Sequence, residues 1–119
     1  MATHNDLGRL GESLAVGYLL ENNYVILERN WRFHKAEIDI IAKKEAQIII
    51  VEVKTRNSNF FGDPQSFVSP EKIKLLLKAT NQYLVSNNIP LEVRFDILAI
   101  IKNKSTQEIT HFKDAFYHF

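Results

Sequence analysis

Apolar side chains recur at two different spacings along the chain, and each spacing predicts one type of element. From Asp6 to Glu21 they recur every three or four residues, which is typical of a helix with one apolar face. Asn22 and Asn23 suit the end of this helix, because asparagine tolerates the left-handed conformation of a C-terminal cap. Gly8 and Gly11 each weaken a helix, so we interpret them as a close approach of backbone or ligand, or as a frayed first turn.

Later segments are rich in Ile, Val and aromatic residues, a composition that predicts strands. In chain order they are Tyr24–Glu28, Glu37–Lys43, Gln47–Thr55, Val93–Lys102 and Glu108–Phe112. A second helix is expected from Pro70, with Ser69 as its cap, to Ser86. The order α-β-β-β-α-β-β predicts an α/β fold in which helices flank a mixed central sheet. No linker or repeat divides residues 1–119, so we expect a single domain.

The end of the third predicted strand combines apolar and charged positions on one face. Side chains alternate between the two faces of a strand, so Ile48 and Ile50 share a face with Glu52 and Lys54. An amphipathic strand with one solvent-exposed face does not explain a face that is apolar at its start and charged at its end. We interpret this pattern as a strand that is buried on both sides and ends at a cleft.

Asp39 on the preceding strand is expected beside this charged end. If residues 43–46 close a hairpin, Asp39 lies opposite Glu52 or within two residues of it, and directly opposed Cβ atoms are about 4.5–5.5 Å apart. Two carboxylates so close repel each other unless a cation lies between them, and hard oxygen ligands suit Mg²⁺ or Mn²⁺. Lys54 in the same cleft can orient a water or stabilise charge on a phosphate. Spacing alone fits a plain salt bridge of Lys54 with one of these carboxylates at least as well.

Composition excludes some classes of site and leaves the function open. The 119 residues include no cysteine, which excludes disulfides, thiolate metal sites and a cysteine nucleophile. The formal net charge of +1 gives no argument for nucleic-acid binding, so that argument depends on where the charges lie. The first residues do not resemble a signal peptide, and the longest aliphatic run, Ile48–Val51, is far shorter than the ~20 residues of a membrane span. We therefore expect a cytoplasmic protein without a membrane partner.

Four short motifs of this chain occur in the same order in a family of small bacterial proteins. They are Gly8-x-x-Gly11-Glu12, Glu37-Ile38-Asp39-Ile40-Ile41-Ala42, Val51-Glu52-Val53-Lys54-Thr55-Arg56 and Arg94-Phe95-Asp96. On these residues the chain resembles the YraN-like (UPF0102) family, and the likeness covers nearly the whole chain. The family is assigned to the restriction-endonuclease-like superfamily, whose nucleases carry the PD-(D/E)xK pattern. The order of acidic residues and lysine also resembles archaeal Holliday-junction resolvases, more distantly.

The resemblance implies a restriction-endonuclease-like fold and a role for each matching residue. Asp39 and Glu52 would be the acidic pair that binds Mg²⁺ or Mn²⁺, and Lys54 would be the catalytic lysine. Glu12 on the first helix would complete the site, directly or through a water. Val53 would offer only its backbone carbonyl to the metal.

Two positions depart from the pattern of the family. The family usually carries glycine directly before the Glu-Ile-Asp stretch, where this chain has Ala36. If the backbone there needs positive φ, alanine is strained, and we expect a small local adjustment without loss of the site. Ile38 stands where the name of the superfamily has proline, which is usual among relatives. Glu37 matches the motif, but no role follows for it.

Basic residues near the motifs are candidates for contacts with phosphates. They are Arg56, Lys72, Lys74, Lys78 and Arg94. Lys74 and Lys78 are one helical turn apart and can form a basic edge, although a solvated helix face is an equal alternative. The segment Asn57–Phe67 is long enough to form a flap over the cleft.

These features lead to a leading hypothesis of a Mg²⁺-dependent nuclease that hydrolyses phosphodiester bonds in DNA. Branched or damaged DNA is a candidate substrate, and RNA is an alternative. A catalytically silent module that binds nucleic acid or protein with the same fold is the second hypothesis. A structural α/β protein whose charges form salt bridges is the third. A homodimer would suit a two-fold branched substrate, although nothing in the sequence requires one.

Overall fold

The computed structural model describes residues 4–57 and 68–115, so the predicted flap lies outside it from residue 58 onward. In chain order the elements are α1 (His4–Glu21), β1 (Val25–Phe33), β2 (Ala36–Lys44), β3 (Gln47–Arg56), α2 (Pro70–Ser86), β4 (Glu92–Lys102) and β5 (Gln107–Phe112). This is the predicted order of helices and strands. Neither helix in the described part of the chain is long and apolar enough to cross a membrane.

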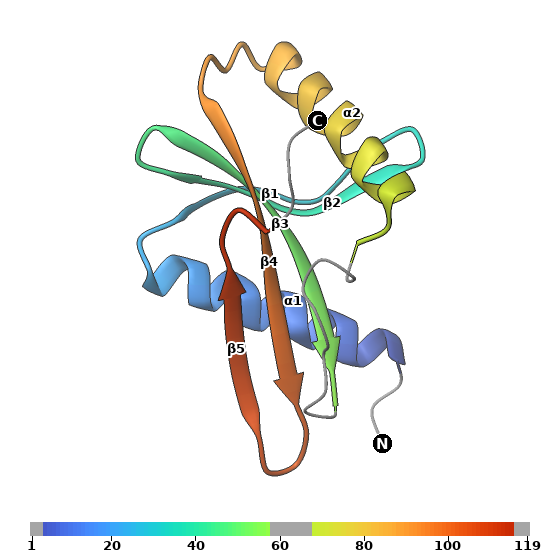
Figure 1. The fold of residues 1–119 in the computed structure, drawn as a ribbon. Coiled ribbons are helices and arrows are strands. Elements are labelled where there is room, and N and C mark those ends of the chain that lie inside the picture. Colours follow the sequence, from blue (N-terminus) through green and yellow to red (C-terminus); the bar gives the residue numbers. More distant parts are fainter. Residues whose placement is uncertain (1–3, 58–67, 116–119) are drawn as a thin grey trace.

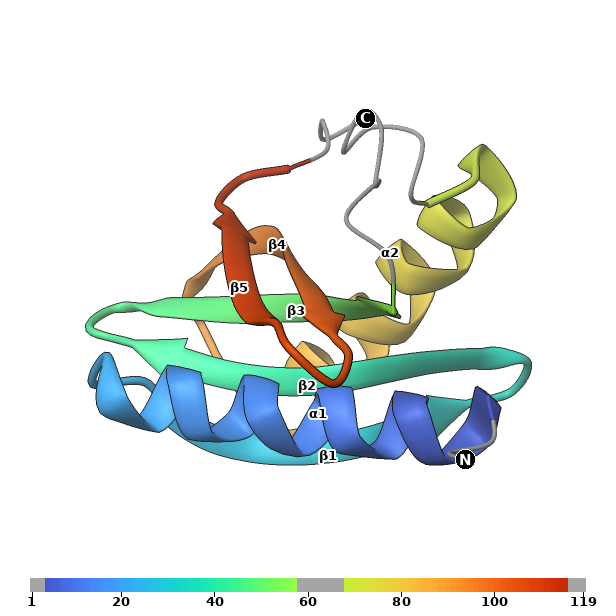
Figure 2. The same ribbon diagram turned by 90° about the horizontal axis from the view of Figure 1, so that it is seen from below.

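The five strands form one mixed sheet in the order β1-β2-β3-β4-β5. The first three strands are antiparallel neighbours, β3 and β4 are parallel, and β5 returns antiparallel to β4. The parallel step needs a crossover, and α2 provides it. Helix α1 runs along one face of the sheet and α2 covers the other (Figures 1 and 2). The predicted α/β architecture, a mixed sheet flanked by helices, is therefore confirmed.

Each helix buries an apolar face against its own side of the sheet. The α1-side core contains Ala15 and Leu19, and the α2-side core contains Ile73 and Leu76. Residues of β3 alternate between these cores, because Ile48 and Ile50 face α2 whereas their neighbours face α1. The expectation that this strand is buried on both sides is confirmed, since Ile48–Val51 are at most 1% exposed. Apolar burial of this kind, at roughly 25 cal/mol per Å², holds the strand rigidly up to its charged end.

Strand β1 is longer than the sequence pattern predicted. It was expected at Tyr24–Glu28, but it spans Val25–Phe33 and pairs with β2 as far as Phe33↔Ala36. Its second half alternates polar residues with Trp31 and Phe33, and Trp31 meets the ring of Tyr83 edge-on at a centroid distance of 5.2 Å. Pairing with β2 and packing of these rings on α2 outweigh the low strand preference of the polar residues. The extension adds polar side chains to the region in front of β2.

Local signals at the helix ends agree with the structure. Ser69 caps α2, and its Oγ accepts a hydrogen bond from the backbone N–H of Lys72 at 3.2 Å, with Pro70 at the first helical position. Asn23 follows α1 with a positive φ of 69°, as expected for a left-handed cap. Because Ser69 fixes where α2 begins, it also fixes where the side chain of Lys72 starts.

Gly11 marks the point at which α1 approaches the sheet most closely among the described glycines. A Cβ atom at this position would lie 1.8 Å from Oγ1 of Thr55 on β3 and 2.9 Å from its Cβ. At Gly8 an added Cβ would meet nothing within 4 Å, so close approach explains Gly11 and not Gly8. The contact holds the next residue, Glu12, against the end of β3.

Candidate metal-binding and catalytic site

The ladder between β2 and β3 stops one step before the acidic pair. It runs from Lys44↔Gln47 to Ile40↔Val51, and one further step would pair Asp39 with Glu52. Instead, Oδ2 of Asp39 accepts a hydrogen bond from the backbone N–H of Val53 at 2.8 Å. The carboxylate of Asp39 thus replaces a backbone partner at the end of the ladder, where its position is fixed by β3 itself.

Strand β2 changes the face on which its side chains lie at Asp39. Ile38 packs in the α2-side core, whereas Ile40 packs in the α1-side core, although residues two apart on a strand normally share a face. The regular alternation of a strand is therefore interrupted at Asp39. As a result, Asp39 lines both a cavity of about 700 Å³ next to α1 and one of about 450 Å³ next to α2.

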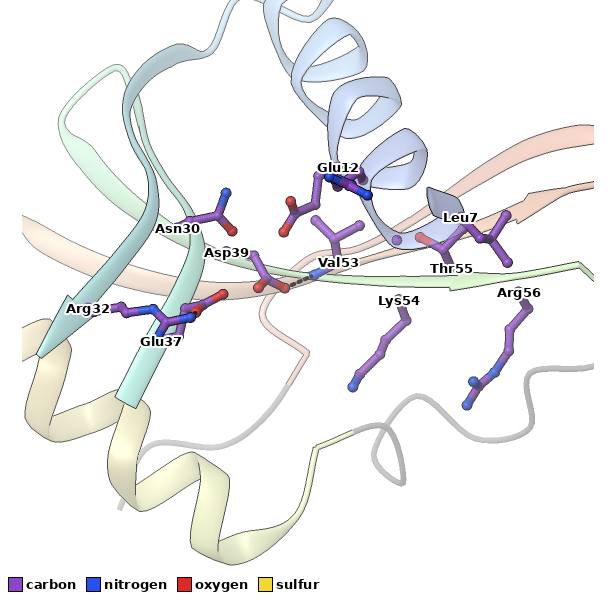
Figure 3. Close-up of a pocket in the computed structure, with 12 residues that line it drawn as sticks. Leu7, Glu12, Asn30, Arg32, Glu37, Asp39, Val53, Lys54, Thr55 and Arg56 are labelled. Carbon is purple, nitrogen blue, oxygen red and sulfur yellow. Dashed lines mark hydrogen bonds and ion pairs between the residues drawn. The ribbon is translucent and has the colours of Figure 1, made fainter. Parts of the chain in front are cut away.

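The larger cavity has three carboxylates, from α1 and β2, and a set of cations. Its acidic residues are Glu12, Glu37 and Asp39. Its basic residues are Arg9, Arg32, Lys54 and Arg56. Figure 3 shows Glu12 on α1 and Asp39 on β2 extending into the same space, with Lys54 and Arg56 on β3 below them. Of the predicted quartet, Glu12, Asp39 and Lys54 line this cavity, whereas Glu52 is not among its lining residues and meets Lys72 of α2.

Glu52 is a buried acid whose ionic partner lies on α2. It is 1% exposed, and its Oε2 lies 2.7 Å from Nζ of Lys72 on α2. Its Oε1 is also buried and has no hydrogen-bond partner among the described residues. Burial, together with the charge of Asp39, raises the pKa of Glu52 to about 7, although Lys72 and Lys54 act to lower it. A buried carboxylate with an oxygen to spare is the kind of group that a bound cation would stabilise.

The other two carboxyl groups of the site are perturbed in the same direction. Burial raises the pKa of Asp39, even though the N–H of Val53 and the charge of Lys72 favour its ionised form. Burial and the charge of Asp39 also raise the pKa of Glu12. In all three groups burial is the largest cause of the raised pKa, and it outweighs the nearby positive charges. Perturbed groups of this kind are enriched at functional sites.

The donors that could hold a metal ion are few. In the described segments, no three His, Cys, Asp or Glu side chains lie close enough together to form a metal site. Asp39 and Glu52 remain as a candidate pair, with the backbone carbonyl of Val53 as a third candidate donor. Mg²⁺ usually binds through one or two carboxylates and keeps several waters, so this donor set fits it.

Comparison with known proteins assigns the chain to a family. Residues 11–100 match the Uncharacterised protein family UPF0102. The chain belongs to UPF0102. UPF0102 proteins of Flavobacterium psychrophilum and Christiangramia forsetii are 60% and 54% identical to it over 119 residues, which is the whole of each chain. A UPF0102 protein of Bacteroides thetaiotaomicron is 45% identical over 117 residues, 98% of this chain and 97% of the relative. The YraN-like (UPF0102) resemblance drawn from the motifs is confirmed.

The basic residues that were expected to contact phosphates do not all line the larger cavity. Arg56 lines the larger cavity beside Lys54. Lys74 is exposed on α2, and Lys78 lines a separate cavity of about 590 Å³ between α2 and the β1–β2 turn. Neither Lys74 nor Lys78 lines the larger cavity, so their contact with phosphates stays a prediction.

Arg94 has a different position from the one expected. Its guanidinium donates to both carboxylate oxygens of Asp96, at 2.9 and 2.8 Å, and to the hydroxyl of Tyr24 at 3.0 Å. Asp96 is fully buried, so the Arg94 side chain is committed to the interior of the UPF0102 fold. Sequence reasoning assigned it to phosphates because a charge on a strand cannot be told from a buried ion pair without knowing its partner.

Three residues of the site were missed or assigned a lesser role. Lys72 was expected to contact phosphate, but its ammonium is the counter-ion of Glu52. Asn30 and Arg32 line the larger cavity, and they were missed because β1 was predicted to end before them. The alternation of polar and aromatic residues over 30–33 is the signal that could have extended the strand.

Ala36 does not need the adjustment that was expected from the missing family glycine. It is a buried residue of β2 that pairs with Phe33, and it is not among the residues with positive φ. The positive φ of this region, 55°, belongs to His34 in the turn before it. The departure from the UPF0102 pattern is therefore accommodated within an ordinary strand.

Proposed function

We propose that this UPF0102 protein is a metal-dependent nuclease with a restriction-endonuclease-like fold, which hydrolyses phosphodiester bonds in DNA. The observation that carries the proposal is the acidic pair Asp39 and Glu52 at the end of a doubly buried strand, with lysines beside it. Two carboxylates buried together destabilise a fold unless a positive charge compensates them. A divalent cation is the ligand that suits their oxygens.

The architecture supports the nuclease fold. A mixed sheet with a helix on each face places the acidic residues where β2 and β3 stop pairing. Helix α1 contributes Glu12 to the same cavity through the close approach at Gly11. Glu12, Asp39 and Lys54, to which the family resemblance assigned roles in a nuclease site, come from three separate elements and line this one cavity.

The donor set supports a divalent cation held by Asp39, Glu52 and the carbonyl of Val53. A bound Mg²⁺ or Mn²⁺ would supply a coordinated water of lowered pKa and would offset the charge of the phosphate. Lys54 lines the cavity and lends positive charge beside the position where charge develops on the phosphate. Arg56 and Arg32 at the same cavity can hold the phosphates on either side.

A second candidate, a DNA-binding module that does not cut, is favoured by one observation. The ammonium of Lys72 already lies against Glu52, where a cation would otherwise neutralise it. If Lys72 keeps this place permanently, the site is complete without a metal. Lys72 extends from the first turn of α2 and its side chain is 40% exposed, so it has room to withdraw toward solvent.

Cleavage is tested with labelled linear, flapped and four-way-junction DNA in Mg²⁺ or Mn²⁺. Asp39→Asn, Glu52→Gln and Lys54→Ala should each lower the rate of strand cleavage by at least about 100-fold, because each removes a group that acts on the water or the phosphate. Glu108→Gln and Lys104→Ala are the matched controls, since both residues are exposed at the far edge of the sheet. Cleavage that survives in all three site variants would rule out this mechanism.

Metal binding is tested separately from cleavage by thermal unfolding. A cation that binds the folded state must raise the unfolding temperature. At a concentration 100 times its dissociation constant it adds about 2.7 kcal/mol to the free energy of unfolding. We expect this rise in the wild type and its loss in Asp39→Asn and Glu52→Gln. A wild type that binds DNA in a gel, never cuts it and shows no metal response would instead establish the binding module.

A further inference from the structure

A cavity outside the catalytic site lies between the β1–β2 turn and the middle of α2. It encloses about 590 Å³, which is within the range of small-molecule sites. From the turn it takes Phe33 and His34, and from α2 it takes Leu75, Lys78 and Asn81. Figures 1 and 2 both show the turn beside α2. None of these residues has a role in the proposed hydrolysis.

This cavity adjoins the catalytic site through a smaller one. The smaller cavity, of about 450 Å³, shares Lys35, Ala36 and Leu75 with the outer cavity. It also shares Glu37 and Asp39 with the catalytic cavity of about 700 Å³. The three cavities thus follow one another along shared lining residues, from α1 past Asp39 to α2. A strand of DNA bound at Asp39 can therefore continue into the outer cavity.

The outer cavity offers flat and apolar surfaces that are accessible to a ligand. The ring of Phe33 stacks on Trp31 at 6.5 Å between centroids and meets the ring of His34 edge-on at 4.2 Å, so His34 offers the more exposed ring. His34 is exposed at the tip of the turn, and Leu75 on the opposite wall is 38% exposed. Aromatic faces beside an open apolar wall are what a nucleobase stacks on, whatever its identity.

The polar residues of the cavity match the remaining parts of a nucleotide. Lys35 and Lys78 are cations that can meet a phosphate. Asn81 and Gln82 carry amides, and an amide both donates and accepts, as the edge of a base requires. A purely apolar ligand would make no use of the two lysines or of Asn81, whereas the amide of Gln82 already donates to Oγ of Ser86 at 2.7 Å. An anionic small molecule would not use the rings.

We propose that this outer cavity binds one unpaired nucleotide of a DNA strand whose scissile phosphate lies at Asp39. The nucleotide must be unpaired, because a base in a duplex has its pairing edge occupied and its faces covered by neighbours. The proposal rests on the proposed nuclease function at one point only, namely that the bound strand runs from this cavity to Asp39. It makes gapped or flapped DNA the preferred substrate class.

Binding is measured by fluorescence anisotropy in EDTA, so that no cleavage takes place. The probe is a labelled duplex with a three-nucleotide gap, and it is compared with a fully paired duplex of the same length. The wild type should prefer the gapped duplex. His34→Asn should reduce that preference at least about five-fold by removing a stacking ring, and asparagine tolerates the positive φ at this position. Leu75→Glu should reduce it by at least as much, because it places a negative charge on the wall of the cavity.

The matched control is Val85→Glu, the same kind of change on the same helix at a position 66% exposed and outside this cavity. It should leave the preference for gapped DNA unchanged. A wild type with no preference, or site variants that keep it, would overturn the proposal. Asp39→Asn distinguishes the two proposals, because it should abolish cleavage and retain the preference. If the wild type prefers gapped DNA but never cuts it, only the nuclease proposal fails.

Discussion

At the scale of single residues, the site is defined by charges that oppose one another. Glu52 is buried with its pKa raised to about 7, yet Lys72 stands 2.7 Å away as a counter-ion. Burial and the nearby Asp39 favour the neutral acid, and two lysines favour the ionised form. A buried pair of this kind contributes little net stability, because desolvation offsets most of the attraction. The residue is better explained by binding than by stability.

Glu52→Gln should therefore stabilise the protein at alkaline pH. The folded-state pKa of about 7 lies above the ordinary value of about 4.3 for glutamate, so between these values the folded state binds more protons than the unfolded state. Stability from this group is complete below about pH 4 and is lost as pH rises through 7. Chemical denaturation should show a gain on the order of 2 kcal/mol at pH 8 and almost none at pH 4. An equal effect at both pH values would contradict the assignment.

At the scale of elements, the site depends on how closely α1 and α2 approach the sheet. Helix α1 approaches β3 at Gly11 and so holds Glu12 in the larger cavity. Helix α2 begins at a defined residue, because Ser69 caps it, and so Lys72 reaches Glu52. Strand β1 continues along β2 beyond its predicted end and adds its polar side chains. Each contribution comes from packing between elements and not from the elements alone.

Gly11→Ala tests the approach of α1. The added methyl would overlap the side chain of Thr55, so a loss of about 1–3 kcal/mol of unfolding free energy is expected. Gly17→Ala is the matched control in the same helix, because nothing lies within 4 Å of its added Cβ. It should raise stability by roughly 0.5–1 kcal/mol through higher helix propensity. Urea denaturation of both variants gives the comparison, and two gains would show that α1 can move away from β3 freely.

At the scale of the whole molecule, a buried polar network on Asp96 joins β4, β5 and α1. His111 Nε2 lies 2.7 Å from Oδ2 of Asp96, and Nδ1 of the same ring lies 3.0 Å from the hydroxyl of Tyr18. Because an ionised Asp96 can only accept, Nε2 of His111 carries a hydrogen, and in a neutral ring Nδ1 then accepts from Tyr18. Arg94 and the N–H of Asp114 also donate to Asp96. The network serves stability at a distance from the candidate site.

Asp96→Asn should weaken the whole fold in a pH-dependent way. Burial alone would raise the pKa of Asp96, but the hydrogen bonds from His111 and Arg94 outweigh it, and the pKa is lowered. Its contribution to stability is therefore present above the ordinary aspartate value of about 3.9 and is lost as pH falls below it. We expect a loss of roughly 3–5 kcal/mol at pH 7, measured by denaturant unfolding, and a smaller difference from wild type near pH 3. Glu108→Gln, at an exposed position, should cost little at either pH.

Local patterns were enough to predict much of this protein from its sequence. The order of elements, the strand buried on both faces, the cap at Ser69 and the candidate residues Asp39, Glu52 and Lys54 all followed from spacing and short motifs. These features depend on neighbours within a few residues, so one sequence contains the information. The family was also determined in this way, because its motifs lie in continuous segments.

Tertiary structure alone decided which groups meet. Lys72 lies against Glu52, which is 20 residues away in the chain, because the packing of α2 on the sheet brings the two residues together. Arg94 turned inward to Asp96, and β2 changed face at Asp39, where its ladder with β3 ends. Such contacts depend on where separate elements pack, and the pattern within one element does not contain that information. The sequence by itself determined the chemical groups of the candidate site, and packing decided their partners and charges.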